Sequence, residues 1–191
     1  MGMYSLFLEQ ERNRSEKLLH NIMPKSIADQ LKKDSKLISM DNPDISVLFA
    51  DIVSFTVMSE KLSAEKIVGF LDEMFSRFDD LTQKYGIEKI KTIGDSYMVV
   101  AGLTTEEKEH AAILFEFGKE LIKISSNYND HKGNPITLRV GINSGPAVSG
   151  VIGKSKFSFD IWGDTINTAA RLESYGSLSR IHMSIKTFKL E

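Results

Sequence analysis

A two-residue break between two short apolar segments is the feature that most constrains the fold. Residues 88–93 and 96–101 each have the length and composition of a strand, and Gly94-Asp95 separates them. A Gly-Asp pair in this position is typical of a tight hairpin turn. Because such a turn makes its two strands antiparallel neighbours, the sequence predicts a sheet that is at least partly antiparallel.

The segments around this hairpin alternate between strand and helix patterns. Ser63 precedes a run with apolar residues at helical spacing, and that helix is expected to end at Gly86. A second helix is predicted over 106–128 and a third over 164–174, capped by Asp164. Strands are predicted over 44–51, 136–143, 148–152, 157–161 and 180–183, with the start of another helix after the last. This order indicates an α+β domain with a mostly antiparallel sheet and helices covering one face.

The composition fits one globular domain and excludes several kinds of site. Hydrophobic residues make up 41% of the 191 residues and charged residues 26%, which excludes a disordered chain. With 0 Cys, disulfides, thiolate zinc sites and cysteine nucleophiles are excluded, and the 4 His lack metal-ligand spacing. The net charge of -2 gives no broad basic surface, so no nucleic-acid partner is expected. No apolar run reaches the ~20 residues of a membrane helix. We expect a cytoplasmic location, either for the whole protein or for this domain as the cytosolic part of a membrane-anchored parent.

Residues 1–40 are expected to form a helical linker or signalling segment ahead of the main domain, 41–191. Pro24 is suited to the first turn of a short helix over 25–33. Upstream positions follow the four-three spacing of a heptad seam with a polar middle, namely Leu8, Arg12, Ser15, Leu19 and Ile22. Two interpretations of the seam stay open, a parallel two-stranded contact and a plain surface helix.

Two aspartates occupy positions where strands end. Asp51 follows the apolar run 47–50, and Asp95 lies in the turn of the next hairpin. If the hairpin lies beside the first strand, the carboxylates approach within about 5 Å, the spacing of cross-strand neighbours. Two like charges at that distance repel unless a cation lies between them. Magnesium binds one or two carboxylates together with phosphate oxygens, so the pair suits nucleotide-bound Mg²⁺. The alternative is that each aspartate is only a polar strand terminator.

The residues after Asp51 form a candidate phosphate-binding loop. Ile52, Phe55 and Thr56 lie in a short stretch where a turn would expose several backbone N–H groups beside the proposed metal. Such groups bind phosphate without a lysine. The alternative interpretation is a β-bulge or a helix entry.

The helix predicted over 164–174 carries a pair of polar side chains on one face. Asn167 and Arg171 are four residues apart and therefore neighbours on a helix. An arginine and an amide together are suited to a phosphate oxygen and a sugar oxygen. The alternative for Arg171 is a pairing with Glu173 or with solvent.

Four separated segments, in order, resemble class III nucleotidyl cyclases. They are Phe49-Ala50-Asp51-Ile52 with Phe55-Thr56, then 89–98, 138–145 and 160–171. The similarity covers about 18–189, and 18–24 is similar to the segment that joins such domains to sensors. The chain therefore resembles a class III cyclase catalytic domain of the adenylyl cyclase type.

The resemblance implies a ferredoxin-like cyclase domain that acts as a head-to-tail homodimer with sites at the interface, in a parent protein that carries an upstream sensor. It implies that Asp51 and Asp95 hold two Mg²⁺ or Mn²⁺ ions and that Arg139 contacts phosphate. Asn167 of the other subunit would orient the ribose, and Arg171 would stabilise charge on the α-phosphate. Family members continue into a terminal hairpin with a phosphate-binding lysine, and no equivalent segment is recognised before Glu191.

Lys91 and Asp160 match the family's purine-selecting pair. An ammonium only donates hydrogen bonds and a carboxylate only accepts them. Adenine presents a ring nitrogen acceptor beside an amino donor, which this pair complements, whereas guanine presents the reverse order. Each mispaired buried group costs roughly 1–3 kcal/mol. We therefore expect ATP as the substrate.

The expected reaction is metal-assisted attack of the ribose 3′-hydroxyl on the α-phosphorus, which gives 3′,5′-cyclic AMP and pyrophosphate. Arg171 would act as charge develops in the transition state. Two alternatives stay open. One is a non-catalytic domain that dimerises and passes a signal, and the other is a guanylyl cyclase.

Overall fold

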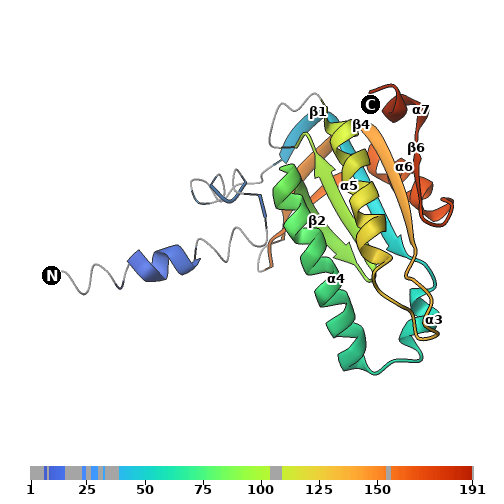
Figure 1. Ribbon diagram of the computed structural model, residues 1–191. Coiled ribbons are helices and arrows are strands. Elements are labelled where there is room, and N and C mark those ends of the chain that lie inside the picture. Colours follow the sequence, from blue (N-terminus) through green and yellow to red (C-terminus); the bar gives the residue numbers. More distant parts are fainter. Residues whose placement is uncertain are drawn as a thin grey trace.

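The computed structural model describes residues 7, 9–15, 23–24, 27–29, 32, 39–103, 109–153 and 156–190. The main body is one six-stranded sheet with helices packed against it (Figure 1). The strands are β1 (Ser39–Ile52), β2 (Glu88–Ile93), β3 (Ser96–Ala101), β4 (Leu138–Ile152), β5 (Ser158–Trp162) and β6 (Arg180–Met183). The helices are α3 (Phe55–Ser59), α4 (Ala64–Tyr85), α5 (His110–Ser125), α6 (Asp164–Ser174) and α7 (Ile185–Phe188).

The strand order is β2-β3-β1-β4-β5, and β6 pairs with β4. Every pairing is antiparallel except that of β6 with β4, which is parallel. The hairpin predicted around Gly94-Asp95 is β2–β3, and it lies beside β1 as the aspartate hypothesis requires. The predicted α+β class with a mostly antiparallel sheet is confirmed.

The prediction of two separate strands over 136–143 and 148–152 is wrong, because both belong to the continuous strand β4. The turn signal was Ser144-Gly145-Pro146. In the structure Ser144 pairs with Ser46 and Gly145 with Ile45, both on β1. Gly145 has a φ of 156°, a value that favours glycine and lets the chain stay extended here. Pairing with a long neighbour therefore outweighs the local turn signal.

The long helix predicted between Ser63 and Gly86 is confirmed as α4. The Ser63 hydroxyl accepts a hydrogen bond from the backbone N–H of Lys66, at 3.4 Å. Gly86 ends the helix in the left-handed conformation, with a φ of 65°. At α6 the N-cap lies one residue earlier than predicted. The cap is Gly163, which makes no side-chain hydrogen bond, and Asp164 is the first helical residue.

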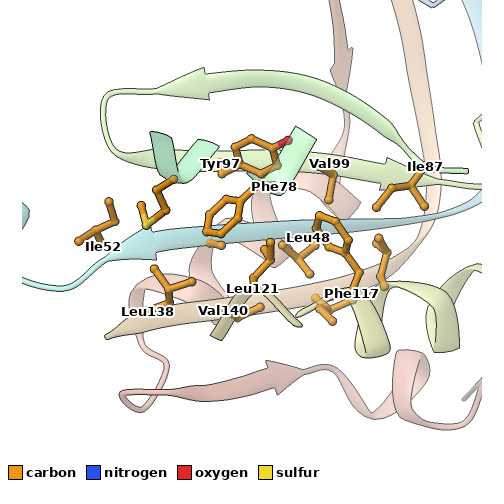
Figure 2. Packing of buried hydrophobic residues seen from close by; sticks show 14 of the residues in the cluster. Leu48, Ile52, Phe78, Ile87, Tyr97, Val99, Phe117, Leu121, Leu138 and Val140 are labelled. Atoms are coloured by element: carbon orange, nitrogen blue, oxygen red, sulfur yellow. The ribbon is translucent and has the colours of Figure 1, made fainter. Parts of the chain in front are cut away.

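The helices are divided between the two faces of the sheet. On one face, α4 and α5 cover a core that includes Leu48, Phe78, Tyr97 and Phe117 (Figure 2). On the other face, Ala169 of α6 joins a second core. The expectation of helices on one face is therefore too simple. Its physical reason is visible in the apolar run 47–50, which has apolar residues on both faces and so needs cover on both.

Part of the expected linker belongs to this second core. Met23, Ile27 and Ala28 are buried there, against Val47 and Phe49 of β1. The backbone is helical at 27–29, and Ala28 donates its N–H to the carbonyl of Pro24, in keeping with the predicted short helix. Leu8, Leu19 and Ile22 of the predicted seam lie outside the described residues. In the described ranges no helix combines the length and the apolar character that a membrane crossing requires.

Candidate active site

The two predicted metal-binding aspartates lie together at one end of the sheet. Asp51 is the penultimate residue of β1, and Asp95 lies in the β2–β3 turn beside it. Burial is the main cause that raises the pKa of the Asp95 carboxyl to about 6, and the charge of Asp51 and a hydrogen bond to it add to the shift. The backbone N–H groups of Asp95 and Ile52 oppose the shift. The two carboxyl groups are therefore close enough to repel one another.

This arrangement fits a divalent cation. A hard cation prefers oxygen ligands, and a charge of +2 between the carboxylates would replace their repulsion with attraction. Among the described residues no cluster of three or more His, Asp or Glu side chains could hold a metal alone. Two carboxylates leave ligand positions for phosphate oxygens, as Mg²⁺ bound with a nucleotide requires.

Arg139 lies directly across from Asp51 in the β1–β4 ladder. Its Nη2 donates to Asp51 Oδ2 at 2.7 Å, and its Nε donates to Glu173 Oε1 at 3.1 Å. The hydrogen bond to Asp51 is the first of several contacts that raise the pKa of Arg139 further above its usual value. The guanidinium therefore links the acidic pair to helix α6.

Glu173 is a site residue that the sequence prediction missed. It is 7% exposed and projects from α6 toward the sheet. Burial, followed by the charge of Asp51, raises its pKa, and Arg139 lowers it. The sequence analysis considered Glu173 as a partner of Arg171, and the structure pairs it with Arg139 instead. A signal was present, because Glu173 follows Ile166 and Ala169 at helical spacing on the apolar face.

A glycine on β4 allows α6 to approach the sheet this closely. A Cβ on Gly141 would lie 2.2 Å from the backbone nitrogen of Glu173 and 2.5 Å from the carbonyl oxygen of Ala169. Only a residue without a side chain fits such an approach. Gly141 therefore brings the Glu173 carboxylate within reach of Arg139, two residues away on the same face of β4.

The candidate phosphate loop adjoins the acidic pair. Ile52 has a buried side chain, and its backbone N–H contributes a hydrogen bond to Asp95. Ser54 adopts a left-handed conformation with a φ of 60°, after which Phe55 and Thr56 begin helix α3. Phe55 packs against the core and Thr56 is exposed. The alternative of a helix entry therefore describes this backbone, and the phosphate-binding role of the loop stays a prediction.

Lys91 and Asp160 meet although they lie on strands at opposite ends of the sheet order. Lys91 Nζ donates to Asp160 Oδ2 at 2.5 Å, from β2 to β5. Asp160 Oδ1 also accepts the backbone N–H of Ile161 at 2.9 Å, which fixes the carboxylate. The side chain of Lys91 is 39% exposed and that of Asp160 16%. The two residues are 69 positions apart in the sequence, and only the tertiary structure brings them into contact.

Asn167 and Arg171 lie on the solvent side of α6. Both are exposed, and neither side chain makes a hydrogen bond or ion pair with another described residue. Glu173 is about 200° around the helix from Arg171, because successive residues are 100° apart. The side of α6 that faces Arg139 and Asp51 is therefore not the side that carries Asn167 and Arg171.

Comparison with known sequences matches residues 38–190 to the adenylate and guanylate cyclase catalytic domain. An adenylate cyclase of Mycobacterium tuberculosis is 42% identical over 183 residues, which are 95% of this chain and 41% of that protein. The human guanylate cyclase soluble subunit beta-2 is 36% identical over 94% of this chain and 29% of its own length. The chain belongs to the class III nucleotide cyclase family.

Solved cyclase domains have the same fold. The adenylyl cyclase CyaB from P. aeruginosa superimposes with a TM-score of 0.72 and 28% identity, over 81% of this chain and 82% of that one. The catalytic core of a rhodopsin-guanylyl cyclase with converted specificity, in complex with ATPalphaS, gives 0.75 and 33% over 80% and 83%. The chain spans less than half of the length of these curated relatives.

Proposed function

We propose that this cyclase domain converts ATP to 3′,5′-cyclic AMP and pyrophosphate. The observation that carries the proposal is the contact between Lys91 and Asp160, a donor and an acceptor held side by side. Lys91 has three N–H donors and donates one of them to Asp160, so two remain for the ring nitrogen of adenine. Asp160 has acceptor capacity left for the exocyclic amino group. The 42% identity to an adenylate cyclase supports the same substrate.

Guanylyl cyclase activity is the second candidate, because relatives named guanylate cyclases are 36% identical to this chain. Guanine would place its oxygen acceptor and its N–H donor in the reverse order. Lys91 and Asp160 would have to exchange roles, which a group that only donates and a group that only accepts cannot do. The pair therefore favours adenine.

The acidic pair would hold the cations. Asp51 and Asp95 would bind Mg²⁺ or Mn²⁺, two per site, together with triphosphate oxygens. When bound, such ions favour the ionised 3′-hydroxyl and neutralise charge on the phosphates. Arg139 and the backbone of Ile52, Phe55 and Thr56 would hold the triphosphate in place.

Two residues of α6 would serve the reacting groups. Asn167 would orient the ribose by hydrogen bonds to its oxygens, and Arg171 would stabilise the negative charge that grows on the α-phosphate. Because Arg171 acts mainly in the transition state, its removal is expected to lower kcat more than substrate affinity.

A homodimer would complete each site. Asn167 and Arg171 project away from the acidic pair of their own chain, so a second copy would supply them. Exposed apolar side chains support a contact with another copy. Val148 and Trp162 are cross-strand partners on the β4–β5 hairpin, with 42% and 39% exposure, and Ile152 lies on the same face. A non-catalytic dimerising domain would also use this surface.

Base selection is tested by Lys91→Ala, measured as the ratio of kcat/KM for ATP and GTP with Mn²⁺. Loss of one hydrogen bond to the purine is expected to lower the preference for ATP by about 5- to 100-fold. Lys89→Ala is the matched control, because Lys89 is on the same strand and pairs with Asp79 at 2.7 Å. A wild-type protein that prefers GTP would overturn the choice of substrate.

The composite site is tested by mixing two inactive variants, Asp95→Ala and Arg171→Ala. A mixed dimer is expected to regain about one intact site of two. Mixed dimers that form without regaining activity would contradict the shared site. A dimer that never turns over either nucleotide would favour the non-catalytic alternative.

A further inference from the structure

One guanidinium group serves two carboxylates that have different surroundings. Arg139 Nη2 contacts Asp51 at 2.7 Å, while its Nε contacts Glu173 at 3.1 Å. Asp51 belongs to the acidic pair, and Glu173 belongs to a packed helix. The two ends of the same planar group are thus bound to elements with different roles.

The end at Glu173 is fixed. The side chain of Glu173 is 10% exposed, and Ser174 Oγ donates to its second oxygen at 3.2 Å. Its backbone is in close contact with Gly141, so α6 has no room to approach β4 further. The Nε contact therefore has the properties of a pivot.

At the other end of the guanidinium, Arg139 and a cation would compete for the Asp51 carboxylate. In this conformation, Arg139 neutralises a carboxylate that would otherwise offer its full charge to a cation. A divalent ion on Asp51 would repel the guanidinium, whereas a triphosphate would attract it. A reorientation of the guanidinium group that keeps Nε at Glu173 would move Nη2 away from the cation and toward the triphosphate. The hydrogen bond to Glu173 would be retained.

We propose that Arg139 is a charge switch, with Glu173 as the residue that positions it. In the nucleotide-free protein Arg139 occupies Asp51 and weakens cation binding. When a nucleotide and its cation arrive together, Arg139 leaves Asp51 for the phosphates while Glu173 retains Nε. This inference rests on the proposed function in that it takes the acidic pair to be the cation site. It makes cation and nucleotide binding mutually reinforcing, and by linkage the effect is reciprocal.

The test measures Mn²⁺ affinity by calorimetry in the absence of any nucleotide, so it does not depend on activity. Arg139→Met is expected to bind Mn²⁺ about fivefold or more tightly than the wild type, within the usual range of coupling between sites. The matched control is Arg180→Met. Arg180 is the cross-strand partner of Arg139 on β6, and its substitution removes the same charge. The control is expected to change the affinity less than twofold.

Glu173→Gln is expected to have the opposite effect. Without the Glu173 charge, Arg139 interacts more strongly with Asp51, and Mn²⁺ binding in the absence of nucleotide becomes about threefold or more weaker. A general field effect would weaken binding in any background. A switch requires that Glu173→Gln has less than a twofold effect when combined with Arg139→Met. Urea unfolding of each variant verifies that the protein is folded.

The outcomes separate the two proposals. If Asp51→Ala leaves Mn²⁺ binding unchanged, the cation site itself is wrong, and with it the proposed function. If binding depends on Asp51 but Arg139→Met behaves like Arg180→Met, the switch alone is overturned. An effect of Glu173→Gln that persists in the Arg139→Met background would also overturn it.

Discussion

The middle and the carboxyl end of β1 carry polar side chains in contrasting arrangements. Near its middle, Ser46 is fully buried and contacts His110 Nδ1 at 2.7 Å and Ser144 Oγ at 2.5 Å. His110 is 4% exposed, and its Nε2 lies 3.6 Å from Asp44. At the carboxyl end, Asp51 is partly exposed and shares its surroundings with Asp95, whose pKa is raised to about 6.

The difference lies in how completely the polar groups are satisfied. The groups around Ser46 satisfy one another within the protein, and such a buried network fixes strand register and the start of α5. The acidic pair is repulsive without a cation, so this end of the strand is less stable than it could be. Local instability of that kind is typical of a binding site, where a ligand supplies the missing interaction.

The largest expected effect is on activity, and it sharpens the contrast between the middle of β1 and its carboxyl end. Asp51→Asn removes the charge of a proposed cation ligand and is expected to lower cyclic AMP formation by at least about a hundredfold. Asp44→Asn, which changes a carboxylate beside the buried network near the middle of the strand, is expected to change the rate less than threefold. Both rates are measured with ATP and Mn²⁺. An Asp51→Asn variant with more than a tenth of wild-type activity would contradict the assignment.

The next effect is on stability and concerns the approach of α6. Gly141→Ala is expected to lower the free energy of unfolding by about 3 kcal/mol, because the added Cβ would meet the backbone of Glu173 at 2.2 Å. Gly69→Ala is the control, since a Cβ there meets nothing within 4 Å and Ala is favoured in a helix by about 0.5–1 kcal/mol. Urea titration measures both, and an unaffected Gly141→Ala would show that α6 can move away.

The buried network at the middle of β1 is expected to respond more moderately. Ser46→Ala would leave the Ser144 hydroxyl and the His110 ring each without one partner, at a cost of about 2 kcal/mol in the free energy of unfolding. Ser59→Ala, an exposed-helix control whose hydroxyl contacts the Thr56 carbonyl, is expected to cost less than about 0.5 kcal/mol. Equal costs for the two variants would mean that the network contributes nothing specific.

The smallest expected effect is a gain in stability. The pKa of Asp95 is raised from 3.8 to about 6, so between these values Asp95 binds more protons in the folded state than in the unfolded state. The contribution of Asp95 to stability therefore falls as pH rises through this range. Asp95→Asn lacks this loss. Allowing for solvent screening, it is expected to be about 1 kcal/mol more stable at pH 7.5 without divalent cations, and the gain disappears below pH 4.

The control for this pH effect is Asp130→Asn. Backbone N–H donation from Asn134 is the largest contact that lowers the pKa of Asp130. The charged form is therefore favoured in the folded state, and the substitution is expected to reduce stability above pH 4. Urea titrations across pH test the two signs together. A stability gain for Asp130→Asn, or a loss for Asp95→Asn at pH 7.5, would contradict the electrostatic account.

The sequence predicted local features best where the chain itself carries the signal. The hairpin at Gly94-Asp95 and helix α4 between Ser63 and Gly86 follow from turn and cap chemistry within a few residues. The continuous strand β4 could not be predicted in this way, because pairing with β1 outweighs the turn signal at Gly145. The burial of Met23 and Ile27 was missed for the same reason, since their partners lie on distant strands.

For the site, the residue types and their order in the chain were enough to indicate the cyclase family and the two aspartates. What only the tertiary structure decided is which charges meet. It pairs Arg139 with both Asp51 and Glu173, and it brings Lys91 to Asp160. The physical reason is that turn and cap signals act over a few bonds, whereas electrostatic contacts depend on distance through space, which the packing of the sheet and α6 determines.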